Sequence, residues 1–249
     1  MPSVRRAAPA RLLGTTAVLV VAAGLLAGCT TTQHQAARMQ VDSARGRAAL
    51  LSTKVTAANP LVTASVSATV AQGGHTAFVV SVRNVGRKPV TDLPISVGYS
   101  LPGRPRVYLN AEEGLQYFQS HLPALFPGKP RVWVYTATRL LPKGAQLFAT
   151  VGDKPSVSAL LSEPDVHVAL KLDGVSDNRL RIGLQNSTSV PQYQLQVYAY
   201  ARRGGRYVAA GNATVTDLGA GSTQKLSLPL VGAAQGATVQ VEAIPTILQ

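Results

Sequence analysis

The sequence predicts an all-β protein built from two tandem β-sandwiches, which follow an N-terminal export segment and a linker. Two observations predict the sandwiches. Apolar and polar residues alternate with a period of two from residue 61 onward, and glycine or proline separates the alternating runs, as is typical of half-buried antiparallel strands. The runs of residues 61–153 also recur in the same order in residues 164–249, which predicts two similar modules.

Residues 1–28 have the profile of an export signal. Arg5, Arg6 and Arg11 precede Leu12–Ala27, an uncharged apolar run of 16 residues. A basic start followed by a short apolar run is typical of a signal peptide. The run is also shorter than the about 20 residues that a helix needs to cross a bilayer. We therefore expect residues 1–28 to be removed during export.

The end of this run carries a specific motif around the single cysteine. Leu26, Ala27, Gly28 and Cys29 resemble the lipobox of bacterial lipoproteins, in which a branched apolar residue and two small residues precede the cysteine. The resemblance implies cleavage between Gly28 and Cys29 and covalent lipid on Cys29. The protein would then be anchored at the extracytoplasmic face of the bacterial cell membrane. The alternative is a free cysteine that packs as a small apolar side chain.

The mature chain is basic and has no cysteine to spare for a disulfide. Without the three arginines of residues 1–28, 21 basic residues remain against 11 acidic ones, a formal charge of +10. Outside the cytoplasm we expect no nucleic-acid partner. The charge points to anionic lipids or phosphate-bearing wall polymers, and the alternative is general solubility without a specific partner. The sequence does not indicate a protein partner.

Residues 29–60 are expected to form the lipidated N-terminus and a flexible linker, and residues 61–153 the first sandwich. One strand face is predicted to hold Val62, Ala64, Val66, Ala68 and Val70. After the turn at Gly73-Gly74, the next strand directs Phe78, Val80 and Val82 inward. Further strands are expected near residues 93–99, 131–138 and 146–151.

Residues 164–249 are expected to form the second sandwich by the same pattern. The inward residues are predicted to be Val166, Val168, Leu170 and Leu172; Leu180, Ile182 and Leu184; Tyr193, Leu195, Val197 and Ala199; Leu226, Leu228 and Leu230; and Val239, Val241 and Ala243.

Particular residues carry the repeat. Phe78–Asn84 aligns with Leu180–Asn186, and Leu125…Gly128 aligns with Leu218…Gly221. A strand that ends in asparagine, followed later by a leucine and a glycine before another strand, resembles the immunoglobulin-like modules of bacterial surface proteins, such as CARDB and FxLYD-type domains. The resemblance implies two immunoglobulin-like β-sandwiches that serve binding, adhesion or spacing.

One segment interrupts the repeat. Residues 110–122 are predicted to contain a short helix, with Asn110 as N-cap, Glu113 at the capping-box position, and Leu115, Phe118 and Leu122 on one face. Such a helix could close an open end of the first sandwich or serve as a binding lid.

The sequence shows no catalytic motif. It has no nucleophile elbow, no His-Glu-x-x-His pair and no phosphate-binding glycine loop, and its four histidines are far apart in the chain. We therefore expect no enzyme activity, no cofactor and no metal site.

Two surface features are candidate contacts. Gln194, Gln196, Tyr198 and Tyr200 alternate on the outward side of one strand and could form a ligand stripe that stacks on sugars. The alternatives are an ordinary exposed face or the contact between the two sandwiches. Arg202, Arg203 and Arg206 surround Gly204-Gly205 at a predicted hairpin tip, where they could contact an anionic surface.

Together these features predict a lipid-anchored, non-catalytic cell-envelope protein that presents immunoglobulin-like binding or spacer modules. The alternatives are an envelope lipoprotein that binds a solute or glycan, and an accessory subunit of a membrane protein complex.

Overall fold

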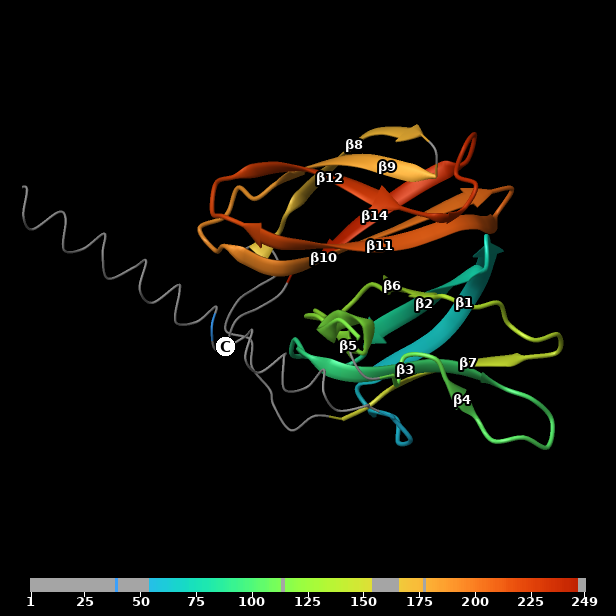
Figure 1. Cartoon of the computed structure of the whole chain (residues 1–249). Coiled ribbons are helices and arrows are strands. Elements are labelled where there is room, and N and C mark those ends of the chain that lie inside the picture. The colour runs from blue at the N-terminus through green and yellow to red at the C-terminus, as the bar shows by residue number, and fades with distance from the viewer. Residues whose placement is uncertain (1–38, 40–53, 113–114, 154–165, 177, 246–249) are drawn as a thin grey trace, which may run out of the picture. The chain divides into compact units, whose positions relative to one another are not determined.

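The computed structural model describes residue 39 and residues 54–112, 115–153, 166–176 and 178–245. The regular secondary structure of these residues consists almost entirely of antiparallel strands (Figure 1), so the predicted all-β class is confirmed. Residues 45–249 belong to one compact unit. No helix of the described residues is long and apolar enough to cross a membrane.

The first sandwich pairs two antiparallel sheets. One sheet has the order β1-β2-β6, with β1 at Val62–Gln72, β2 at His75–Asn84 and β6 at Arg131–Ala137. The other sheet is built around β3, Leu93–Ser100, which pairs with β7, Gln146–Val151, and with the short strands β4, Val107–Tyr108, and β5, His121–Leu122.

The second sandwich repeats this plan. The sheet β12-β9-β8 contains β8, Ala169–Ser176, β9, Arg179–Gln185, and β12, Thr223–Pro229. The sheet β13-β11-β10-β14 contains β10, Gln192–Arg203, β11, Arg206–Leu218, β13, Val231–Gly232, and β14, Thr238–Ile244. β11 was not among the strands expected from alternation, although it is the second arm of the hairpin predicted at Gly204-Gly205.

The two sandwiches have the same strand plan. In each, the first, second and last-but-one main strands form one sheet, β1-β2-β6 or β8-β9-β12, and the third main strand pairs with the last, β3 with β7 or β10 with β14. Both predicted Gly-Gly turns exist, and all four glycines have positive φ between 56° and 81°. Two successive positive-φ residues match the twist of a two-residue hairpin.

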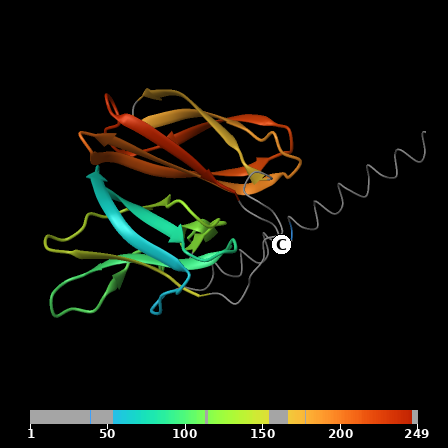
Figure 2. The ribbon, with the colours of Figure 1, turned by 180° about the vertical axis from the view of Figure 1, so that it is seen from behind.

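A continuous apolar layer joins the two sandwiches. The first core, around Phe78 and Trp133, extends to Tyr198 and Ile244 of the second sandwich, and β11 contacts β1, β2 and β6. Figures 1 and 2 show from opposite sides that β10 and β11 lie next to the sheet β1-β2-β6. Val79, on the side of β2 away from the interior of its own sandwich, is fully buried as a result.

A β-bulge changes the predicted face of β1. The register shifts between Val66 and Ala68, so that Val66 lies opposite Val80 but Ala68 lies opposite Val79. The five residues expected on one face therefore divide between both faces. The first three follow the inward residues of β2, whereas Val70 lies on the side of the second sandwich, near Gly232.

The helix predicted over residues 110–122 is wrong in extent. The described part of this segment contains one 3₁₀-helix, Tyr117–Gln119 (η1), followed by β5. The Asn110 side chain caps no helix. Its Oδ1 accepts a hydrogen bond from Val97 N–H, and its Nδ2 donates to the carbonyls of Ile95 and Gln119. Phe118 and Leu122 are buried as expected, because their side chains fill the first sandwich.

Candidate binding surface

The lipidation residues predicted from the sequence, Gly28 and Cys29, lie outside the described residues. The other predicted site residues, those of the glutamine and tyrosine stripe and of the arginine hairpin, belong to β10 and β11.

The structure places Tyr198 and Tyr200 of the stripe between the two sandwiches, whereas Gln194 is only partly buried. Gln196, Tyr198 and Tyr200 are 2%, 1% and 7% exposed. The Tyr200 hydroxyl donates to Glu242 Oε1 at 3.5 Å, and Glu242 Oε2 accepts from the Val132 N–H of β6 at 3.3 Å. Burial raises the pKa of Tyr198 well above 10 and, less strongly, that of Tyr200. In this structure the tyrosines form part of the contact between modules.

Two of the three arginine side chains at the hairpin contact residues of their own module. The Arg202 guanidinium stacks over the Tyr207 ring, 4.2 Å from its centroid, and donates to the Tyr207 hydroxyl. Arg203 donates to the carbonyl of Gln235. Arg206 is exposed at the start of β11. The expected anionic contact at this tip stays a prediction.

A different surface, on the outward face of β8, β9 and β12, has the features of a binding site. The strand registers arrange its residues in three rows. One row holds Ala169, Gln185 and Thr223; the next holds Lys171, Gly183 and Lys225; the third holds Gly174, Arg181 and Ser227. We call this surface the Lys171–Lys225 groove.

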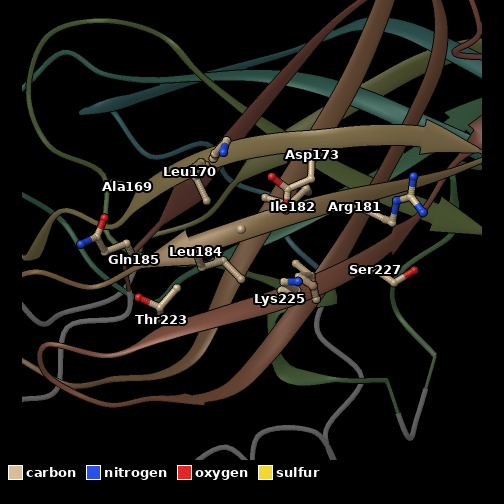
Figure 3. A pocket seen from close by; sticks show the side chains of 13 residues that line it. Ala169, Leu170, Asp173, Arg181, Ile182, Leu184, Gln185, Thr223, Lys225 and Ser227 are labelled. Carbon is tan, nitrogen blue, oxygen red and sulfur yellow. The ribbon is translucent and has the colours of Figure 1, made fainter.

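The Lys171–Lys225 groove encloses about 920 Å³ and is open to solvent. Figure 3 shows the labelled side chains of Asp173, Arg181, Lys225, Ser227 and Thr223 along three neighbouring strands. Three cations, Lys171, Arg181 and Lys225, and one carboxylate, that of Asp173, line it. All four side chains are exposed. The surface can therefore attract an anion while it also offers hydroxyl and carboxylate groups.

Gly183 forms the low point between the two lysines. Its φ is not positive, so the backbone conformation does not require glycine. An added Cβ would stand 3.7 Å from Asp173 Oδ2 and 3.9 Å from Lys171 Cβ, which are ordinary contacts. By contrast, an added Cβ at Gly98 or Gly211 would come within 1.9 or 2.0 Å of a carbonyl oxygen. Packing therefore explains Gly98 and Gly211 but not Gly183.

Sequence reasoning missed this groove because it considered the strands one at a time. The alternation of β9 assigns Arg181, Gly183 and Gln185 to the outward face, and this signal was present in the sequence. The pairing of β9 with β12, some forty residues later in the chain, cannot be read from either strand alone.

A smaller hollow of about 270 Å³ lies where β6, β8 and β14 meet. Arg131, His167 and Glu242 line it together with apolar residues. Glu242 already accepts one hydrogen bond from Tyr200 of its own module and one from the Val132 N–H of the first module. Among the residues that the structure describes, no three His, Cys, Asp or Glu side chains are grouped as a metal site would need.

No protein-family model matches this chain, and no curated protein is similar to it. Any functional proposal must therefore come from the residues themselves.

Proposed function

We propose that this chain is a lipid-anchored, non-catalytic protein of the bacterial cell envelope that presents immunoglobulin-like modules for binding. The observation that carries the binding role is the contrast between equivalent sheets. The sheet β1-β2-β6 buries its outward face against the second sandwich, whereas the equivalent sheet β8-β9-β12 exposes a concave surface lined by charged, hydroxyl-bearing and apolar residues. Because one of these two sheet faces packs on the neighbouring module and the other is open to solvent, the open face is available to a ligand.

The anchor is proposed from the sequence of residues 1–29. A cysteine directly after two small residues and an apolar run is the substrate pattern of lipoprotein processing. Each buried methylene of an attached acyl chain contributes about 0.8 kcal/mol, so two or more chains hold a protein at a membrane where one does not. Of the expected linker, only residues before 54 would serve to join this anchor to the modules, because Val55 and Asn59 are buried and hydrogen-bond to the first sandwich.

Substitution of the cysteine tests the anchor. Cys29→Ser should abolish lipid attachment and leave residues 1–28 uncut, because a serine offers no thiolate to the lipid donor. Intact-mass measurement of membrane and soluble fractions reads both effects. Thr31→Ser is the matched control, since it changes a hydroxyl residue two positions later and should be processed like the parent. A mature N-terminus other than an acylated Cys29 would contradict the proposal.

A specific observation also favours the second candidate, an envelope lipoprotein that binds a solute or glycan. The groove volume of about 920 Å³ falls within the about 300–1,000 Å³ of small-molecule sites. This candidate predicts binding of uncharged oligosaccharides that does not depend on salt, so a salt titration separates it from recognition of an anion.

A further inference from the structure

We propose that the Lys171–Lys225 groove binds a polymer of hydroxyl-bearing units joined by phosphodiesters. The inference rests on the proposed envelope location for the source of the polymer, but the chemistry of the site stands on its own residues. Lys171, Lys225 and Arg181 supply the positive charge, Gly183 supplies the space between them, and Asp173 and Gln185 supply acceptors for hydroxyl groups.

The spacing of the cations suits phosphate groups. Lys171, Gly183 and Lys225 lie directly opposite one another on adjacent strands, so the two lysine Cα atoms are about 10 Å apart at the usual strand separation. Both ammonium groups can extend toward the space above Gly183. Arg181 lies in the next row, where its planar guanidinium can bind two phosphate oxygens at once.

The carboxylate of Asp173 restricts which anionic ligands can bind in the groove. Asp173 Oδ2 lies close above Gly183, where it would repel a densely charged polyanion. A polymer in which phosphates alternate with polyol or sugar units avoids this repulsion, because a hydroxyl can donate to Asp173 while the phosphates contact the lysines. The Gln185 amide and the hydroxyls of Thr223 and Ser227 extend the polar lining.

The position of Gly183 supports an occupied groove. Glycine in the interior of a strand is destabilising relative to alanine and often marks close approach of a ligand. Neither backbone conformation nor packing requires glycine here. The equivalent position in the first sandwich is Ser81 of β2, on the face that packs against the second sandwich. Of these two equivalent positions, the one on the solvent-exposed sheet face is occupied by glycine, Gly183, and the one on the packed face by serine.

The concavity favours a polymer over a lipid surface. A chain molecule can lie across the sheet and reach the floor at Gly183, whereas a flat bilayer would meet only the side chains around it. Comparison of binding to poly(glycerol phosphate) with binding to vesicles of phosphatidylglycerol and phosphatidylcholine separates these two sources of phosphate.

The test measures binding of poly(glycerol phosphate) to the purified full-length mature protein in neutral detergent at low salt. The double variant Lys171→Gln/Lys225→Gln should bind at least about tenfold more weakly, since each charge near a phosphate contributes about fivefold. The double variant Lys129→Gln/Lys143→Gln is the matched control: both lysines are exposed on the first sandwich, and the net charge changes equally. The control should bind within about twofold of the parent.

Two variants fill the groove without changing its charge. Gly183→Ala adds a Cβ for which there is room, and Gly183→Val adds bulk with a residue that favours strands. Both should unfold at the same temperature as the parent or higher, and Gly183→Val should lose at least about tenfold in affinity. Asp173→Asn should tighten binding of inorganic polyphosphate by more than it tightens binding of poly(glycerol phosphate).

Three results would overturn the inference: unchanged affinity in Gly183→Val, an equal loss in the two double lysine variants, or binding only to vesicles of phosphatidylglycerol and phosphatidylcholine. Because the assay uses purified protein in solution, its outcome is independent of lipid attachment. If the protein binds the polymer but carries no lipid on Cys29, the proposed anchor is wrong and the proposed binding role of the groove is unaffected.

Discussion

Two buried asparagines hold equivalent loops in the two sandwiches. At the end of β2, Asn84 Nδ2 donates to the carbonyls of Lys88 and Leu125, and its Oδ1 accepts from Gly86 N–H. At the end of β9, Asn186 Nδ2 donates to the carbonyls of Val190, Leu218 and Gly219, and its Oδ1 accepts from Thr188 N–H. Each asparagine therefore ties its following loop to the leucine that precedes the last-but-one main strand, β6 or β12.

This arrangement gives a physical reason for the sequence marks of the repeat. Buried carbonyls need donors, and an asparagine side chain offers two N–H groups while its oxygen accepts from the backbone two residues later. The leucines are 1% exposed in both sandwiches. The asparagine and the leucine thus recur in both halves because one supplies the donor and the other the buried carbonyl.

We expect Asn186→Ala to lower the free energy of unfolding by about 2–4 kcal/mol, because the substitution leaves buried carbonyls without donors. Urea denaturation followed by circular dichroism measures the change. Gln224→Ala, at an exposed position of β12, removes an amide of similar size and should cost less than about 0.5 kcal/mol. Similar losses in the two variants would refute a structural role for Asn186.

At the scale of elements, the equivalent sheet face is buried in the first sandwich and exposed to solvent in the second. Val79 of β2 corresponds to Arg181 of β9 in the repeat. Val79 is 0% exposed beneath the second sandwich, whereas Arg181 is exposed in the Lys171–Lys225 groove. The two strands therefore share the inward pattern and differ on the outward side.

Exchange of these residues tests the assignment of the two faces. Val79→Arg should destabilise the protein by more than about 3 kcal/mol, because it buries a charge without a partner. Arg181→Val should change stability by less than about 0.5 kcal/mol and should weaken binding of a phosphate polymer. Thermal unfolding of both variants under one buffer condition decides the matter. A tolerated Val79→Arg would mean that the modules do not pack through this face.

The alternation of apolar and polar residues within single strands predicted where several of these elements lie. Residues 131–138 and 146–151 were expected as strands, and β6 and β7 occupy Arg131–Ala137 and Gln146–Val151. The prediction of a helix over residues 110–122 was wrong because the Asn110 side chain binds backbone groups of β3 and the last carbonyl of η1, and not the N–H groups at the start of a helix. An asparagine followed by acidic residues has the same local signature in both cases, so only the surrounding strands decide between them.

At the scale of the whole molecule, polar groups as well as apolar side chains join the two modules. The Gln72 side-chain oxygen, at the end of β1, accepts from Gly232 N–H at 2.9 Å and from Asn178 Nδ2 at 3.3 Å. At a second place, Val132 N–H donates to Glu242. These bonds and the layer around Tyr198 link residues far apart in sequence, so the modules are expected to unfold together.

Separate modules test how far each depends on the other. Fragments of residues 61–152 and 163–249 should each be β-rich by circular dichroism, because each contains both sheets of a sandwich. Each should also melt at a lower temperature than the full-length protein, since separation exposes Val79 and Val134 on one side and Tyr198 on the other. If neither fragment folds while the full-length protein unfolds in one cooperative transition, the two halves make one folding unit.

The sequence by itself determined the local features: where most strands run, which side chains face inward except in the last part of β1 and at the exposed Leu172, the two Gly-Gly hairpins, and the asparagine and leucine positions of the repeat. Alternation and turn chemistry are properties of neighbouring residues, so a linear reading detects them. The lipobox at Cys29 is likewise a local motif, and the lipid anchor stays a prediction.

Only the tertiary structure decided which outward faces are open. A single β-bulge moved the last part of β1 to the other face, and the stripe around Tyr198 became an internal contact. Packing between β1-β2-β6 and β10-β11 buried one sheet, while the pairing of β9 with β8 and β12 assembled the Lys171–Lys225 groove. These outcomes depend on contacts between strands far apart in the chain, which no local pattern specifies.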